Sequence, residues 1–411
     1  MREQTMDDLR QVTLGQVLKL RSSRAAGDAP LLSVTASRGV ILQEESGRRD
    51  SSNVDKSLYL QVHAGDIVYN TMRMWQGVSG LASRDGIVSP AYTVCTPTPD
   101  VHPEYLARVL KHPEMVARFY RASQGLVSDT WNVRYSEFAK ISTLLPSLRE
   151  QHRIVEIFDA IDTQIVANRR IVGKLQKTRS GVMDRLFAEG VVAGRQKSLT
   201  SVGEIPTSWN VVSIEDICTV ESGGTPSRAE EDVFFSTSGT PWVKTLDLNE
   251  ASISATAECV TDLAIEHTRL RVFPPRTVLV AMYGGWAQIG RTACLAVPAA
   301  VNQAVCALRP RAAGEILPEF LMLALQQGRS RWRGFAASTR KDPNITKSDV
   351  HDFLVPVPSL SEQERILKVA SSYSDRLLWE LEAGNRLESL KEALADDLIT
   401  GRVRVPVSDG L

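Results

Sequence analysis

The chain has 411 residues, of which 43% are hydrophobic and 23% charged, and its 48 Lys and Arg residues balance 48 Asp and Glu residues. This length exceeds one ordinary hydrophobic core and predicts two to three domains. Zero formal charge excludes a protein coated in basic surface, so any nucleic-acid contact must come from local clusters of cations. No apolar run reaches the roughly 18 residues that a membrane span needs.

The N-terminal sequence MREQTMDDLRQ lacks the apolar region of a signal peptide. The five cysteines are scattered, with no C-x-x-C pair and no His/Cys grouping at zinc spacing, which predicts reduced, mostly buried thiols and no metal site. We therefore expect a cytoplasmic protein. The cysteines are Cys95, Cys218, Cys259, Cys294 and Cys306.

Residues 1–147 are predicted to form a first globular domain. Short strand-like runs such as Leu58–Val62 and Asp66–Tyr69 dominate it, bounded by Gly, Pro and Asn. A helix is expected over Pro103–Arg121.

Residues 148–190 read as one long helix. Ser147 and Glu150 have the S-x-x-E spacing of a capping box, in which the hydroxyl and the carboxylate each accept a backbone N–H of the first turn. Apolar residues recur at 3-4 spacing from Ile154 to Leu186, and Asn168 interrupts this stripe. The stripe is too narrow for a domain core and favours pairing with another helix.

A linker is predicted over residues 191–210, because this stretch is rich in Gly, Ser and Thr. A second globular domain, residues 211–359, follows with strand-like runs at Thr277–Met282 and Ala304–Leu308 and a helix at Pro318–Arg333. Ser359 and Glu362 then open a second long helix over 360–402, and residues 403–411 form a tail.

The second half of the chain repeats the first. Seven of eleven residues are identical between 144–154 and 356–366, at a spacing of 212 residues, and weaker echoes place Trp75 opposite Trp286 and Cys95 opposite Cys306. The predicted fold class is therefore α+β, with two tandem β-rich α/β domains. Each domain is followed by a long α-helix, and the two helices pair as an antiparallel coiled coil in a pseudo-two-fold repeat.

No catalytic motif stands out. The sequence has no Walker-type loop, no G-x-S-x-G elbow, no H-E-x-x-H and no N-P-P-[FYW] run of an adenine methyltransferase. The Gly-rich run Ser222–Arg228 resembles a phosphate loop, although a tight turn explains its two glycines equally well. No catalytic residue is therefore assigned.

Basic residues cluster with aromatic ones in both globular domains. Arg and Lys bind phosphates, and Arg, Gln and Asn side chains can pair with base edges, whereas a solvated charged face is the alternative interpretation. Trp75 and Trp286 are interpreted as packing residues. The candidate DNA-binding residues are Arg21, Arg24, Arg73, Gln76, Gln124, Arg134, Gly223, Gly224, Thr225, Ser227, Arg228, Lys244, Arg291, Arg340, Lys341 and Asn344.

The repeated P-S-L-x-E-Q-x-x-I motif before a long helix resembles the specificity subunit of type I restriction-modification systems. The resemblance covers nearly the whole chain and extends to G-E-I-P-x-x-W at 203–209 and to S-G-G-T-P at 222–226. The first half has Ser22-Ser23-Arg24 in place of the G-G-T-P loop, so the two domains are expected to read different DNA sequences.

This resemblance implies a function without catalysis by the chain itself. Two target-recognition domains would each read one half of a split, asymmetric site in double-stranded DNA, held apart by the helices as a ruler. Two modification subunits that bind S-adenosylmethionine and methylate adenine would dock on the helices. Restriction subunits that use ATP and Mg would join them, and this chain would bind no cofactor itself.

Two other classes of function remain open from the sequence. One is a coiled-coil scaffold that binds no DNA, and the other is a degenerate fused restriction-methylation enzyme. Basic-aromatic clusters count against the scaffold, and the missing methyltransferase motif counts against the enzyme.

Overall fold

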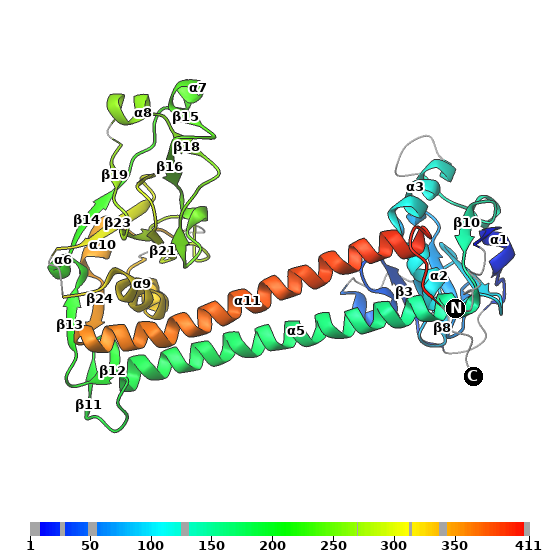
Figure 1. The fold of residues 1–411 in the computed structure, drawn as a ribbon, viewed down its shortest axis with the longest axis horizontal. Coiled ribbons are helices and arrows are strands. Elements are labelled where there is room, and N and C mark those ends of the chain that lie inside the picture. Colours follow the sequence, from blue (N-terminus) through cyan, green and yellow to red (C-terminus); the bar gives the residue numbers. More distant parts are fainter. Residues whose placement is uncertain are drawn as a thin grey trace, which may run out of the picture. The chain divides into compact units, whose positions relative to one another are not determined.

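The computed structural model describes residues 9–24, 29–47, 56–124, 131–268, 270–311, 315–336 and 343–406. The chain divides into two compact units, and each takes one half of both long helices. Unit 1 comprises Met1–Arg170 and Leu381–Leu411, and unit 2 comprises Ile171–Glu380. The expected α+β class, with a β-rich region before each long helix, is confirmed (Figure 1).

Unit 1 is built on short antiparallel strands around a central sheet of order β2–β9–β6–β7. The sheet strands are β2 (Leu18–Leu20), β9 (Tyr92–Pro97), β6 (Ile67–Asn70) and β7 (Ser79–Leu81). The paired strands outside it are β1 (Arg10–Thr13) with β10 (Ser142–Leu145), β3 (Leu32–Thr35) with β4 (Gly39–Leu42), and β5 (Leu60–Val62) with β8 (Gly86–Val88).

Short helices connect these strands, and the helix predicted over Pro103–Arg121 is in fact two. Pro113 starts the second of them, and His112 before it is extended, at φ −65° and ψ 139°. A proline cannot continue a helix and disfavours the helical conformation of the residue before it, which explains the break. The helices of unit 1 before the long one are α1 (Leu14–Val17), η1 (Glu44–Ser46), η2 (Met74–Gln76), α2 (Pro103–Val109), α3 (Pro113–Ala122) and α4 (Tyr135–Phe138).

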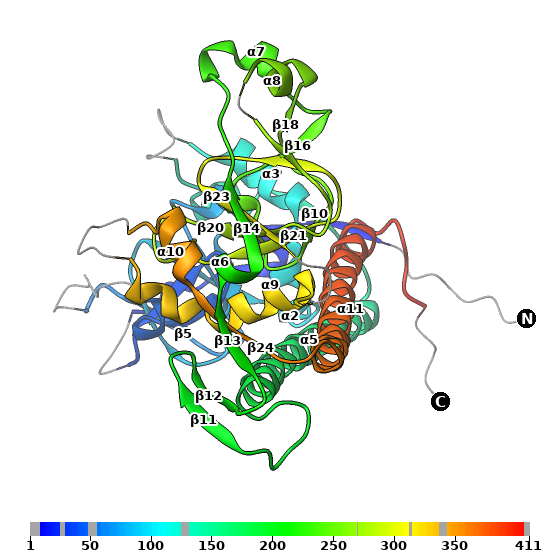
Figure 2. The same ribbon diagram turned by 90° about the vertical axis from the view of Figure 1, so that its left-hand side faces the viewer.

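Unit 2 has two five-stranded sheets, of order β14–β23–β20–β21–β17 and β15–β18–β16–β22–β19. Figure 2 faces this unit and shows β13 beside β24. The first sheet and the β13–β24 pair contain β14 (Cys218–Ser222), β23 (Val305–Pro310), β20 (Val278–Ala281), β21 (Thr292–Leu295), β17 (Ser252–Ile253), β13 (Asn210–Ser213) and β24 (Leu354–Val357). The second sheet contains β15 (Phe235–Ser236), β18 (Cys259–Val260), β16 (Thr240–Val243), β22 (Ala299–Val301) and β19 (Val272–Phe273).

The helix predicted over Pro318–Arg333 is also interrupted. The α-helix ends at Gln327, and a 3-10 helix follows Gly328. The helices of unit 2 before the second long one are α6 (Ile214–Ile217), η4 (Arg228–Glu230), α7 (Glu231–Phe234), η5 (Thr245–Asp247), α8 (Asp262–His267), α9 (Pro318–Gln327), η6 (Arg329–Gly334) and α10 (Lys347–Asp352).

The two units repeat one topology. The pair β1–β10 of unit 1 corresponds to β13–β24 of unit 2, and the order β2–β9–β6–β7 corresponds to β14–β23–β20–β21. Cys95 in β9 and Cys306 in β23 are both buried free thiols, and burial raises the pKa of each to about 12. The internal duplication inferred from sequence is thus present in the strand order. In unit 2 the strands β15, β18, β16, β22 and β19 form one sheet, whereas in unit 1 β5–β8 and β3–β4 are separate pairs.

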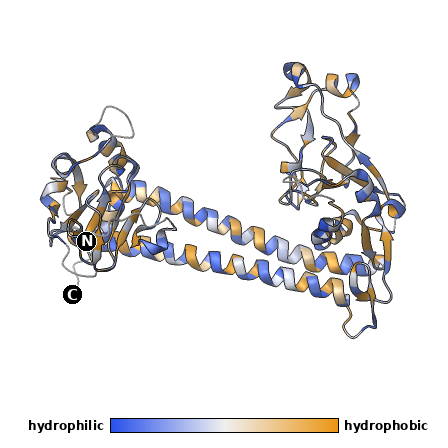
Figure 3. Cartoon of the chain, turned by 180° about the vertical axis from the view of Figure 1, so that it is seen from behind, coloured by the Kyte–Doolittle hydropathy of each residue, from blue (hydrophilic) through white to orange (hydrophobic). Residues whose placement is uncertain are grey.

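The two long helices are α5 (Leu148–Glu189) and α11 (Leu360–Ile399). Within unit 1 they are antiparallel, since Asp162 binds Lys391 and the later residue Arg169 binds the earlier residue Glu388, the latter at 2.7 Å. Ile154, Phe158, Ile161 and Ile165 of α5 are buried. Figure 3 shows apolar residues alternating with polar ones along both helices, as a narrow seam requires.

The start of each long helix is anchored by the Gln of the repeated motif. The side chain of Gln151 donates to the carbonyl of Pro146 at 2.9 Å and accepts from the backbone N–H of His102 at 2.8 Å. Gln363 does the same with Pro358 at 2.9 Å and Leu317 at 2.8 Å. Both Gln side chains are fully buried, so the motif fastens each long helix to the start of α2 or α9.

The motif's glutamates do not complete the predicted capping boxes. The backbone N–H of Glu150 donates to the Ser147 hydroxyl at 3.3 Å, but the Glu150 carboxylate binds the Arg404 guanidinium and the backbone N–H of Val405 at 3.0 Å. The Glu362 carboxylate binds Arg195 at 2.7 Å. Both carboxylates are buried and bind arginines that are distant in sequence. The S-x-x-E spacing alone therefore predicted the wrong partners for them.

The segment predicted as a linker contains regular structure. Strands β11 (Lys197–Thr200) and β12 (Gly203–Pro206) form an antiparallel hairpin, and the indole of Trp209 donates to Glu362 at 3.1 Å. Residues 191–210 therefore pack on the start of α11. Among the described residues, no helix combines the length and the apolarity that a membrane crossing requires.

Candidate nucleic-acid interface

Unit 1 presents a loop immediately after the central strand β6. We call residues 71–77 the first tryptophan loop. The backbone N–H of Val133 donates to the Thr71 carbonyl at 2.9 Å, and the Trp75 indole donates to the Met72 carbonyl at 3.0 Å. The loop is thereby fixed against the segment that precedes α4.

Unit 2 has the corresponding loop after β20, and we call residues 282–290 the second tryptophan loop. The backbone N–H of Ile345, just before α10, donates to the Met282 carbonyl at 3.0 Å. Gly284 and Gly285 adopt φ of 108° and 70°, in the left-handed region that favours glycine. The two loops therefore occupy equivalent places in the two units.

Trp286 lies at the surface, contrary to its interpretation as a packing residue, whereas Trp75 is half-buried and packs against other aromatic rings. The Trp75 ring lies 5.3 Å from Trp131 and 6.4 Å from Tyr120, measured between ring centres, and Tyr120 is 52% exposed. Trp286 is 45% exposed, with the Arg333 guanidinium 5.6 Å from its ring centre. Exposed aromatic clusters rimmed by polar groups are typical of interaction surfaces.

The structure gathers several predicted DNA-binding residues around the first tryptophan loop. Arg73 and Gln76 belong to the loop itself, and both are exposed. Gln124 pairs with Asn132 through two backbone hydrogen bonds, and the exposed Arg134 is the N-cap residue of α4. Residues with guanidinium and amide groups thus lie in the loop and in the segments bonded to it, which is the chemistry needed to bind phosphates and base edges.

Arg21 and Arg24 are not part of this group. Arg21 binds the buried Asp66 through two hydrogen bonds of 2.8 and 3.0 Å and also donates to Thr96, so its guanidinium is committed to the fold. Arg24 makes an isolated bridge with Leu60, at the start of β5.

Gly223 of the Gly-rich loop has a structural role. A Cβ on Gly223 would lie 1.7 Å from the Val301 carbonyl oxygen, and the backbone N–H of Gly224 already donates to that oxygen at 3.0 Å. Thr225 hydrogen-bonds Gln303, and the Ser227 hydroxyl accepts from the N–H of Ala229 at 3.3 Å. Tight packing therefore accounts for Gly223, whereas a Cβ on Gly224 would meet nothing within 4 Å.

Arg228 and Lys244 converge on one carboxylate. Glu258 accepts from Arg228 at 2.6 Å and from Lys244 at 2.8 Å, and the Arg228 guanidinium lies 4.0 Å from the centre of the Phe235 ring. The hydrogen bond from Arg228, with further help from Lys244 and against the effect of burial, lowers the pKa of Glu258 to about 2. The positive charge of this pair is therefore partly neutralised within the protein.

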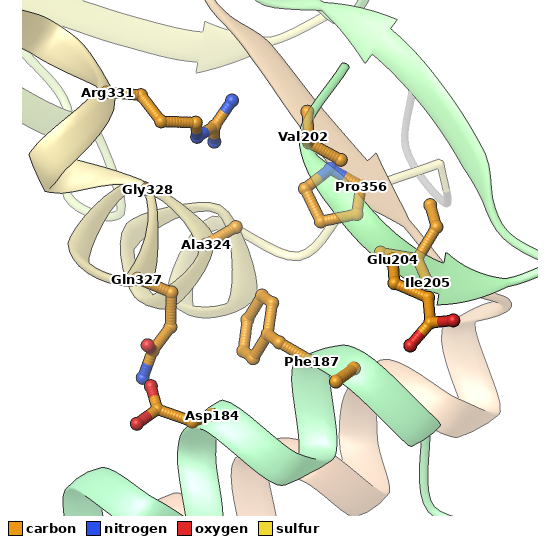
Figure 4. A pocket seen from close by; sticks show the side chains of 11 residues that line it. Asp184, Phe187, Val202, Glu204, Ile205, Ala324, Gln327, Gly328, Arg331 and Pro356 are labelled. Atoms are coloured by element: carbon orange, nitrogen blue, oxygen red, sulfur yellow. The ribbon is translucent and has the colours of Figure 1, made fainter. Parts of the chain in front are cut away.

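The three arginines that follow α9, Arg329, Arg331 and Arg333, have different roles. Arg329 donates to the carbonyls of Ala287 at 2.8 Å and Ile289 at 3.2 Å, and so clamps the second tryptophan loop. Arg331 donates to the Leu354 carbonyl at 2.8 Å and faces a cavity of about 210 Å³ (Figure 4). Burial lowers the pKa of Arg331. Both arginines are structural, whereas Arg333 is exposed.

The remaining predicted residues also belong to unit 2. Asn344 is exposed beside Ile345, which holds the second tryptophan loop, and Arg291 directly follows that loop and is half-buried. Arg340 and Lys341 lie outside the described residues. The sequence interpretation missed Tyr120 and the exposure of Trp286. An aromatic residue beside a basic one, as in Tyr120-Arg121, was the available signal for the former.

Comparisons with known proteins point to one family. The family model described as "Type I restriction modification DNA specificity domain" matches residues 206–392. The MjaIX type I restriction enzyme specificity subunit of Methanocaldococcus jannaschii is 28% identical over 43% of this chain, and the match spans only 40% of that relative. The HindI specificity subunit of Haemophilus influenzae is 20% identical over 97% of this chain and 100% of its own length.

Solved structures share the fold over nearly the whole chain. The HsdS subunit of Thermoanaerobacter tengcongensis has a TM-score of 0.53 at 19% identity, covering 96% of this chain and 97% of that one. A chain from a study of type I R-M complex assembly has a TM-score of 0.61 at 18% identity, covering 96% and 98%. These findings identify a type I restriction-modification DNA specificity domain over residues 206–392, and they show that nearly the whole chain shares the fold of a solved HsdS subunit and is similar in sequence to type I specificity subunits.

Proposed function

We propose that the chain reads a bipartite, asymmetric sequence in double-stranded DNA, with unit 1 binding one half-site and unit 2 the other. The observation that carries this proposal is the pair of equivalent tryptophan loops, which differ in the side chains that they expose. Arg73 and Gln76 lie on the first loop, and Tyr283 and Trp286 on the second. One topology with two different surfaces is suited to reading two different sequences.

The proposal extends to partner proteins. Two modification subunits, which would bind S-adenosylmethionine and methylate adenine, dock on α5 and α11, and restriction subunits that use ATP and Mg join them. The chain itself contributes recognition, no catalytic residue and no cofactor, and it works in the cytoplasm. Exposed apolar side chains on α11, such as Leu378 at 60% and Leu390 at 49%, support a protein partner on that helix.

Exchange of one domain tests whether each unit reads its own half-site. Residues 1–147 are replaced by the first domain of another specificity subunit, and the methylated sequence is determined by methylome sequencing of cells that also carry the modification subunits. One half of the methylated sequence should change and the other should stay. A simultaneous change in both halves contradicts two independent readers. Loss of methylation is resolved by checking that the exchanged chain still assembles with the modification subunits.

A further inference from the structure

The second tryptophan loop holds a large ring rigidly in solvent. A Cβ on Gly290 would lie 2.2 Å from Cδ1 of the buried Trp332, so the loop end packs tightly on that indole. Arg329 clamps the carbonyls of Ala287 and Ile289 from the other side. An element that is ordered before binding loses little conformational entropy when it binds, so a fixed and exposed ring is suited to recognition.

Arg333 orients this ring. Its guanidinium lies 5.6 Å from the centre of the Trp286 ring, within the range of a cation–π contact, and the side chain is exposed. No carboxylate of the described residues is within ion-pair distance of Arg333, in contrast to Arg228 and Arg329. The cation beside the ring thus keeps its positive charge available for a DNA phosphate.

The two loops differ in the chemistry of their exposed side chains. Arg73 and Gln76 of the first loop can form paired hydrogen bonds with guanine or adenine. The second loop exposes Tyr283 at 40% and Trp286 at 45%, separated by two glycines. In the major groove, the apolar group that a base presents to such a ring is the C5-methyl of thymine.

We propose that Trp286, oriented by Arg333, determines sequence specificity in unit 2 by an apolar contact with a thymine methyl group. The inference rests on the proposed function and adds to it a residue and the base that this residue reads. A contact with a partner protein instead of DNA is the competing use of the same ring, and the experiment below separates the two.

The test uses the assembled complex of the full chain with its modification subunits. Bound duplexes are selected from a randomised DNA library with the wild type, Trp286→Leu, Trp286→Phe and Trp379→Leu. Trp379 is the matched control, because it is 51% exposed and also carries an arginine, Arg376, 4.6 Å from its ring centre, but lies on α11. Assembly of each variant is measured by size-exclusion chromatography.

We expect Trp286→Leu to lower the preference for thymine at one position of one half-site about tenfold, within the range of a single base contact. Trp286→Phe should retain part of the preference. Trp379→Leu should retain all of it in the complexes that assemble, even if the change on α11 lowers the yield of assembled complex. Replacing that thymine by deoxyuridine, which removes only the methyl group, should weaken binding by the wild type and leave binding by Trp286→Leu unchanged.

Three results overturn the inference. They are unchanged preferences for Trp286→Leu, an equal loss of affinity on every sequence, and a loss of subunit assembly specific to Trp286→Leu, which would assign the ring to a protein partner. If the wild-type complex selects no sequence, the proposed function itself fails. If it selects one and Trp286→Leu retains it, the inference alone fails.

Discussion

Glu150, in the first turn of one long helix, binds Arg404, in the segment that follows the other long helix, through Nε at 2.9 Å. Glu362 and Arg195 repeat the contact in unit 2 with the helices exchanged. Each copy of the motif therefore holds the chain segment that leaves the other copy's helix. In unit 1 the segment after α11 also packs on Leu9, since a Cβ on Gly401 would lie 2.4 Å from the Leu9 side chain.

Breaking this contact should be costly, because Glu150 is 2% exposed and Arg404 is 17% exposed. Glu150→Ala leaves a largely buried guanidinium without its carboxylate, and we expect a loss of about 3 kcal/mol in the free energy of unfolding. Urea unfolding measures the loss, and hydrogen exchange at the amides of Arg404 and Val405 localises it. The control is Glu156→Ala, which removes an exposed pair with Arg153 in the same helix and should cost less than about 1 kcal/mol. Equal stability of the two variants would contradict the role of Glu150.

The sequence predicted where the long helices begin, because a proline, a capping serine and a 3-4 apolar stripe are local signals. It did not predict what Glu150 and Glu362 bind. Arg404 lies 254 residues from Glu150, and no local pattern records a contact at that distance. A glutamate at this position can complete a capping box or form a buried ion pair. The capping-box prediction is right for the Ser147 hydroxyl and wrong for the Glu150 carboxylate.

The sequence predicted several residues of the candidate interface, but it did not predict how they are arranged. Arg73, Gln76, Gln124 and Arg134 belong to segments that meet, because Val133 binds Thr71 and Gln124 pairs with Asn132. Arg21 and Gly223 were equally good candidates for DNA contact in the sequence. In the structure, Asp66 binds Arg21 and Val301 packs against Gly223, so both residues serve the fold. Whether a cation is buried or paired depends on residues that are distant in sequence, and a cluster of cations along the sequence does not reveal them.

Two helix glycines give opposite predictions. A Cβ on Gly384 of α11 would lie 2.7 Å from Oδ1 of the buried Asn168, whereas one on Gly173 of α5 would meet nothing within 4 Å. Gly384→Ala should destabilise the protein by about 1 kcal/mol by displacing the amide. Gly173→Ala should stabilise it by about 0.5–1 kcal/mol, since glycine disfavours a helix. Urea unfolding of both variants provides the comparison, and a stabilising Gly384→Ala would show that Asn168 moves away freely.

The Glu258 cluster predicts a dependence of stability on acid. Its folded pKa, about 2, is below the ordinary value of 4.5, so its contribution is complete above about pH 4.5 and is lost as the pH falls toward 2. Glu258→Gln should lower stability at neutral pH and flatten the pH dependence in that window. Unfolding followed by tryptophan fluorescence from pH 7 to 2 checks this, because Trp242 lies beside both cations. Glu231→Gln is the control, since it removes a 61%-exposed partner of the same Arg228 and should change stability little. An unchanged slope for Glu258→Gln would contradict the assignment.

The last prediction concerns the helices as a spacer. Each unit contains half of α5 and half of α11, so a longer α5 requires an equally longer α11. The antiparallel register that brings Asp162 to Lys391 places Leu175 opposite about Leu377, and four residues are therefore inserted after each. Four residues lengthen a helix by about 6 Å and nearly match its period, so the apolar seam stays in rough register.

Along B-DNA, about 6 Å corresponds to nearly two base pairs. The double insertion should therefore lengthen the unread spacer of the DNA target by one or two base pairs and leave both half-site sequences intact. Two-residue insertions at the same places are the control, because they rotate each stripe by about 200° and should prevent folding or assembly. Methylome sequencing of cells with each variant gives the result. An unchanged spacer, at wild-type amounts of assembled complex, would mean that the helices do not set the distance between the half-sites.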